Sequence, residues 1–169
     1  MGKRYRTLIQ GPALFFVTTS TLDRKNYFTN KAKLALVRAE LFRTVELCDC
    51  YLMGYVIMPN HVHVLIGFID GGKGLIKFMH SFKGIVRKRL IGDNLFWERG
   101  YDDLVIITEE QFKIKLNYIH FNPVKRGLVE APEDWRFSSY RFWEMNESNA
   151  YLTMDFSWMK TVDFNHTQK

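Results

Sequence analysis

The chain has 169 residues, of which 47% are hydrophobic and 25% charged, a composition typical of one folded domain and not of a disordered chain. No apolar run is long enough to cross a bilayer, and the first residues lack the apolar stretch of a secretory signal, so we expect no membrane association. The two closely spaced cysteines do not suit a disulfide framework, which favours a cytoplasmic location, and the net charge of +6 favours an anionic partner.

The first half of the chain predicts one helix among three strands. Residues 12–20 are rich in aromatic and β-branched side chains and predict a strand. Residues 31–48 repeat apolar side chains at helical spacing. Residues 51–58 and 61–68 are mainly apolar and are separated by a Pro-Asn turn, which predicts an antiparallel hairpin.

The second half predicts two further helices with an extended segment between them. One helix covers residues 75–91, the extended segment covers residues 95–107, and the last helix begins near Glu109. Because proline disfavours helical geometry in the residue before it, we expect the last helix to end by Asn122. This order predicts an α+β fold of the ferredoxin-like type, a two-layer sandwich with helices on one face of an antiparallel sheet and the other face open for binding.

Two histidines, His61 and His63, lie in the second strand of the predicted hairpin. Side chains two residues apart in a strand point to the same face, so both imidazoles can converge on one metal ion. A His-x-His pair on its own is also common as a structural element, so the motif needs support from other residues.

The last helix contains a second candidate group. Tyr118 and Asn122 lie one turn apart, and Lys115 shares their face of the helix. The apolar side chains of this helix form a separate stripe that should pack against the sheet, which leaves Tyr118 outside the core. A tyrosine oxygen can attack a polarised phosphorus, and an amide oxygen can join two imidazoles around a metal ion. A surface tyrosine without a catalytic role is the alternative.

The basic residues are concentrated before residue 130. Residues 1–129 carry 20 basic and 11 acidic side chains, whereas residues 130–169 carry four and seven. Residues 71–92 contain six basic residues and no acid, which favours contact with nucleic acid, although a solvated helix face is the alternative. The candidates for DNA binding are Lys83, Arg87, Lys88, Lys115 and Arg126.

Three segments resemble one known family. The segment Met-Pro-Asn-His-Val-His-Val-Leu, which begins at Met58, resembles the HUH strand of the one-tyrosine single-strand DNA transposases. The segment from Tyr118 to Leu128 resembles their nucleophile helix. The segment Trp-Arg-Phe-Ser-Ser-Tyr, which begins at Trp135, resembles the tryptophan/double-serine signature of the REP-associated tyrosine transposase branch.

The resemblance covers residues 12–143 and defines the expected organisation of the chain. We expect one domain at residues 1–143, with an extra C-terminal helix that carries the nucleophile. We expect residues 144–169 to form an acidic tail and no separate domain.

The resemblance implies a metal-dependent endonuclease and strand transferase that acts on single-stranded DNA next to a hairpin. It implies that Tyr118 is the nucleophile of a 5′-phosphotyrosine intermediate, that His61 and His63 bind the metal, and that Asn122 is a third ligand. The metal would be Mg or Mn. Where relatives carry Asp-His and a later Arg, this chain reads Asp-Leu-Val-Ile-Ile from Asp103, so no role is transferred to that stretch.

Two other functions remain open from the sequence. A metal-dependent phosphodiesterase that uses water would not need Tyr118 and would form no covalent adduct. A non-catalytic nucleic-acid-binding module on the open sheet would bind in the presence of a chelator and would not need His61 or His63. Both a monomer and a homodimer are compatible with the family.

Overall fold

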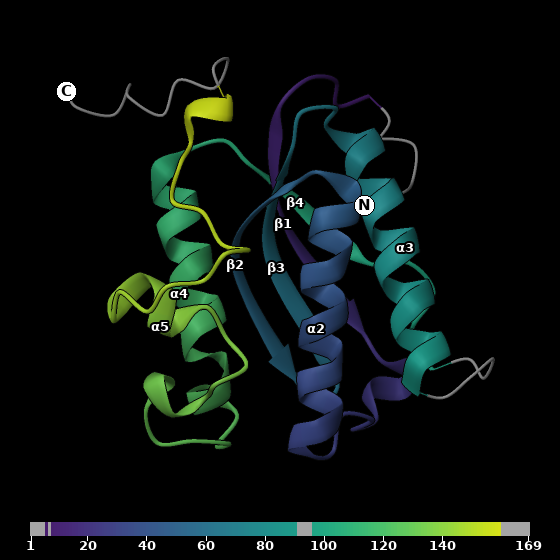
Figure 1. Ribbon diagram of the computed structural model, residues 1–169, viewed down its shortest axis with the longest axis vertical. Coiled ribbons are helices and arrows are strands. Elements are labelled where there is room, and N and C mark those ends of the chain that lie inside the picture. The colour runs from purple at the N-terminus through teal and green to yellow at the C-terminus, as the bar shows by residue number, and fades with distance from the viewer. Residues whose placement is uncertain (1–5, 7, 91–95, 160–169) are drawn as a thin grey trace.

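The computed structural model describes residues 6, 8–90 and 96–159 (Figure 1). Four antiparallel strands form one sheet in the spatial order β2-β3-β1-β4. The strands are β1 (Ala13–Ser20), β2 (Tyr51–Met58), β3 (His61–Phe68) and β4 (Asp102–Ile106). The helices are α2 (Lys31–Cys48), α3 (Gly72–Leu90), α4 (Glu109–Lys125) and the short α5 (Tyr140–Glu144), with 3-10 turns at Leu22–Arg24, Pro132–Asp134 and Ser157–Met159. The βαββαβ order up to β4 is that of the ferredoxin-like fold, so the predicted fold class is confirmed.

Helices cover both faces of the sheet. Figure 1 shows α2 and α3 on one side of the sheet and α4 on the other. Phe15 and Val64 belong to the core beneath α2 and α3, whereas Phe16 and Leu65 belong to a second core beneath α4. The expectation of an open face is therefore wrong where α4 packs on β2 and β3. The reason is that these strands carry apolar side chains on both faces, and both faces must be covered to keep them from water.

The element boundaries in the first half agree closely with the predictions. α2, β2 and β3 match them, and β1 begins one residue later than predicted. α3 begins at Gly72 rather than at residue 75, and its predicted end, together with residues 92–95, lies outside the described residues. β4 covers only Asp102–Ile106 of the predicted extended segment, and Trp97, buried in the core, forms only an isolated bridge with Thr21.

The last helix does not end at Asn122 as predicted but continues through Pro123 to Lys125. A proline removes one backbone hydrogen bond from a helix, and here the loss falls in the final turn. The carbonyl groups of that turn still have partners, because Asn122 accepts the backbone N–H of Arg126 and Pro123 accepts that of Leu128. The helix can therefore extend beyond the proline.

The segment after α4 runs back along the outer edge of β2. The backbone N–H of Ile57 donates to the carbonyl of Phe137 at 2.8 Å, and that of Ser139 donates to the carbonyl of Tyr55 at 2.9 Å. Further on, Leu152 and Trp158 are buried in the two cores. The predicted acidic tail thus packs on the domain as far as residue 159, and residues 160–169 lie outside the described residues.

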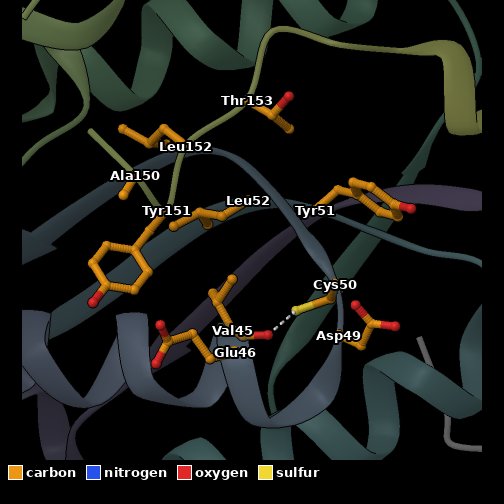
Figure 2. Close-up of a pocket in the computed structure, with 10 residues that line it drawn as sticks. All are labelled: Val45, Glu46, Asp49, Cys50, Tyr51, Leu52, Ala150, Tyr151, Leu152 and Thr153. Atoms are coloured by element: carbon orange, nitrogen blue, oxygen red, sulfur yellow. Dashed lines mark hydrogen bonds between the residues drawn. The ribbon is translucent and has the colours of Figure 1, made fainter. Parts of the chain in front are cut away.

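A shallow pocket of about 300 Å³ lies between the end of α2, the start of β2 and residues 150–153 (Figure 2). Leu52 and Leu152 border it, and the thiol of Cys50 donates to the carbonyl of Val45 at 3.6 Å. Its lining contains none of the predicted site residues. Among the helices in the described part of the chain, none is long and apolar enough to cross a membrane.

Candidate functional site

The two histidines begin β3 and face the α4 side of the sheet. His61 pairs with Ser20 and His63 with Thr18, both near the end of β1. Their imidazole rings lie edge to face with centroids 4.7 Å apart, as the alternation of a strand predicts. Both residues are buried, with 3% and 4% of their surface exposed.

Hydrogen bonds to the outer ring nitrogens orient both imidazoles. The Nδ1 atom of His61 lies 2.6 Å from Asn60 Oδ1, and an amide oxygen only accepts, so Nδ1 carries the proton. The Nδ1 atom of His63 lies 2.8 Å from the hydroxyl of Thr18. The Asn60 oxygen thus fixes the tautomer of His61, whereas the Thr18 hydroxyl can either donate to or accept from His63 Nδ1.

The surroundings keep both imidazoles neutral. Burial, followed by the positive charges of Arg24 and Arg126, lowers the pKa of His61 to about 4. Burial also lowers the pKa of His63 well below its usual value, and the charges of His61 and Arg24 act in the same direction. A neutral imidazole is the form that binds a metal ion, so both histidines are in the ligand form at pH 7.

Asn122 brings a third polar group to the histidines from the last turns of α4. Its Nδ2 atom lies 3.3 Å from His63 Nε2, and only 4% of the residue is exposed. Its Oδ1 atom is buried without a hydrogen-bond partner. The described residues contain no cluster of three or more His, Cys, Asp or Glu side chains suited to a metal.

Tyr118 lies one turn before Asn122 at the edge of this group. Its ring meets the ring of His63 edge to face, with centroids 5.3 Å apart, and meets Phe16 at 6.0 Å. These neighbours hold the ring in place. The residue is still 37% exposed, so molecules in solution can reach it. The ammonium groups of Lys115 and Lys125 lie 5.9 Å and 5.6 Å from the centre of the ring.

Arg24 belongs to this site although the sequence analysis did not select it. Its charge acts on both histidines together with that of Arg126. The amide of Asn60, which holds His61, also donates to the carbonyl of Arg24 at 2.9 Å. Asp23 and Arg24 have φ values of 54° and 52°, a left-handed conformation that is costly outside glycine and is concentrated at functional sites. The polar loop gave no periodic pattern that would have marked this residue.

The predicted DNA-binding residues fall into two groups. Lys115 and the exposed Arg126 lie beside Tyr118 and the histidines. Lys83 and Arg87, both half-buried, and the exposed Lys88 lie on α3, across the sheet from α4.

Lys83 serves a structural purpose that its sequence context did not reveal. Its ammonium donates to the carbonyl of Glu98 at 2.8 Å and to that of Gly100, and Trp97 donates to the Lys83 carbonyl at 3.1 Å. Burial lowers the pKa of Lys83 to about 8, against the opposing effect of Glu98. Two of its three donors are therefore used to hold the loop before β4.

The tryptophan/double-serine segment fastens α4 to β2. Trp135 Nε1 donates to the carbonyl of Ile57 at 3.0 Å. The hydroxyl of Ser139 accepts the backbone N–H of Tyr55 at 3.0 Å and lies 2.9 Å from Nε2 of His120, a buried residue of α4 whose pKa burial lowers to about 4. His120 is thus a supporting residue of α4 that the sequence analysis did not select.

No protein-family model matches the chain. A Haemophilus influenzae protein provisionally named as a REP-associated tyrosine transposase is 25% identical over 150 residues, which cover 80% of this chain and 84% of that protein. An Escherichia coli K12 protein named "REP-associated tyrosine transposase" is 23% identical over 145 residues, which cover 83% of each chain. The chain is similar to REP-associated tyrosine transposases over most of its length. These matches agree with the resemblance predicted from the sequence.

A solved structure supports the same fold. The structure of a REP-associated tyrosine transposase bound to a REP hairpin matches with a TM-score of 0.64 and 20% sequence identity. The match covers 87% of this chain and 88% of that one. The shared fold therefore extends well beyond the four strands of the sheet.

Proposed function

We propose that this protein is a metal-dependent endonuclease and strand transferase that cleaves and rejoins single-stranded DNA through Tyr118. The observation that carries the proposal is the convergence of His61, His63 and Asn122 at 4% exposure or less beside a tyrosine that solvent can reach. These residues come from two elements, β3 and α4, that lie far apart in the sequence.

The residues present fit a divalent metal ion such as Mg or Mn. The imidazoles of His61 and His63 are neutral and their outer nitrogens are engaged, while the buried Asn122 Oδ1 lacks a partner. When bound, the metal would polarise the scissile phosphate as a Lewis acid. Nitrogen and amide ligands without a carboxylate leave most of the metal's charge uncompensated, which suits a site whose substrate is an anion.

Tyr118 performs the covalent step in this proposal. Its oxygen attacks the phosphorus, the bond from phosphorus to the 3′ oxygen breaks, and that oxygen takes up a proton as a free 3′ hydroxyl. The phenol proton leaves to solvent, which the exposure of Tyr118 permits. The phosphotyrosine link retains the ester bond, so the reverse attack by a 3′ hydroxyl rejoins DNA without a nucleotide cofactor.

The positive groups around Tyr118 support an interaction with DNA phosphates. Lys115 and Lys125 flank its ring, and Arg24 and Arg126 act on the histidines. The solved relative is bound to a REP hairpin, so a hairpin next to a single strand is the proposed substrate here. Lys83, Arg87 and Lys88 would contact DNA only if the strand passes around the sheet to α3.

The test uses hairpin-containing single-stranded oligonucleotides labelled at either end, with Mn or with EDTA, and a denaturing gel that detects a protein–DNA adduct. We expect a metal-dependent adduct that is lost in Tyr118→Phe and retained in Tyr151→Phe, a control in which the ring stacked on Phe42 is preserved. Cleavage that survives Tyr118→Phe would show attack by water. Binding without cleavage, unchanged by EDTA, would show a non-catalytic module.

A further inference from the structure

A second cavity, of about 370 Å³, lies on the face of the sheet opposite the histidines. One wall is α2, where Lys31, Ala35 and Arg38 follow one another at helical spacing on one side of the helix. The other wall is the segment that follows the 3-10 turn at Pro132–Asp134, and it carries Arg136 and Arg141. The small side chain of Ala35 leaves room between the walls.

The charges in this cavity do not balance. Four cations line it, and Glu147 is the one carboxylate among its lining residues. Glu147 is engaged with Arg141 at 3.2 Å, and Arg141 also donates to the carbonyl of Glu133. Among the described residues, no carboxylate forms an ion pair with Lys31, Arg38 or Arg136.

Two of the four cations, Arg38 and Arg141, are held in place by hydrogen bonds. The guanidinium of Arg38 donates to the Arg136 carbonyl at 3.0 Å and lies over the ring of Phe137 at 5.3 Å from its centre. At the floor, burial raises the pKa of Tyr55 to about 12, opposed by the charge and hydrogen bond of Arg38, so the phenol stays neutral. A fixed, planar guanidinium matches the oxygens of a phosphate group.

The position of the cavity relates it to the candidate site. The Phe137 carbonyl accepts the N–H of Ile57, and Ile57 pairs with Val62, the residue between the two histidines. The cavity therefore opens at the end of the sheet that carries His61 and Tyr118, but on the other face.

We propose that this cavity, between α2 and residues 136–141, is a second phosphate-binding site that holds a backbone phosphate of the DNA strand away from the cleavage site. The choice of DNA as the source of the phosphate rests on the proposed function. A small phosphate ester would use the same guanidinium and ammonium groups, and the experiment separates the two sources.

Arg136→Glu and Lys31→Glu reverse one exposed charge on each wall, and neither side chain carries a hydrogen bond of the fold among those the structure describes. Lys113→Glu is the matched control, because it makes the same charge change at an exposed position on α4, where its ion pair with the exposed Glu109 contributes little to stability. The first measurement is the affinity for a hairpin-containing single-stranded oligonucleotide as a function of salt. We expect the slope of log affinity against log salt to fall by about 0.7 in each cavity variant and to stay unchanged in the control.

The second measurement is the melting temperature of the full chain in inorganic phosphate and in chloride at equal ionic strength. Stabilisation by phosphate that is lost in both cavity variants, with an unchanged DNA slope, would assign the site to a small phosphate ester and overturn the DNA assignment. No change in either measurement for either variant would overturn the site itself. A reduced slope in a protein that forms no adduct at Tyr118 would support the cavity and refute the proposed function.

Discussion

Replacement of Ser139 by alanine tests whether the C-terminal segment fastens the nucleophile helix. The Ser139 hydroxyl accepts the N–H of Tyr55 at 3.0 Å and lies 2.9 Å from His120 Nε2, and all three residues are buried. Alanine leaves the amide and the imidazole without this partner. A buried polar group that loses its partner costs about 1–3 kcal/mol, so we expect the free energy of unfolding to fall by about 2–4 kcal/mol.

Urea unfolding followed by circular dichroism measures this loss, with an unchanged m value as the sign that only stability has changed. Ser138→Ala is the matched control, because its hydroxyl only bridges its own turn, from the Tyr140 N–H to the Trp135 carbonyl. We expect the control to cost about 1 kcal/mol or less. A cost below about 1 kcal/mol for Ser139→Ala, or equal costs for both variants, would refute the reasoning.

Three further predictions follow from the structure. In EDTA, the free energy of unfolding should fall as the pH is lowered from 7 to 5, because His61 and His120 have folded pKa values of about 4 and take up protons mainly in the unfolded state. A urea midpoint that does not change with pH would contradict this. Gly67→Ala should destabilise the chain by about 1–3 kcal/mol, because a Cβ atom there would meet the Trp158 indole at 2.0 Å, and Trp158→Ala should relieve that penalty in a double-mutant cycle. Asn122→Ala should raise the Mn concentration needed for half-maximal adduct at least tenfold, whereas Asn122→Asp should not, which an Mn titration measures.

Local hydrophobic patterns predicted the elements that depend mainly on their own residues. α2 and the β2–β3 hairpin match their predicted bounds because helical periodicity and the Pro-Asn turn are contained within each segment. The position of α4 over the second face was missed, although continuous apolar strands such as residues 51–58 are typical of a sheet that is covered on both sides. The end of α4 was missed because Pro123 falls in the final turn, where it breaks only one bond.

The candidate site was predictable only where its residues form sequence motifs. His61 and His63 share a face by strand alternation, and Tyr118 and Asn122 share one by helical spacing. The closeness of the two pairs depends on how α4 packs across β3, which the resemblance implied and no local pattern specifies. The contribution of Arg24 depends in the same way on tertiary contacts, here with Asn60.

The positions of Tyr118 and Asn122 depend on residues far beyond α4. The apolar stripe of α4 packs on the sheet, His120 reaches Ser139, and Trp143 and Phe156 pack against Phe112 at the start of the helix. The proposed attack on phosphorus is sensitive to misplacement of about 1 Å, so a helix held at one face alone would not place Tyr118 precisely enough. The segment after α4 therefore helps to position Tyr118, because Ser139 bonds His120 of α4 while Trp135 bonds the Ile57 carbonyl of β2.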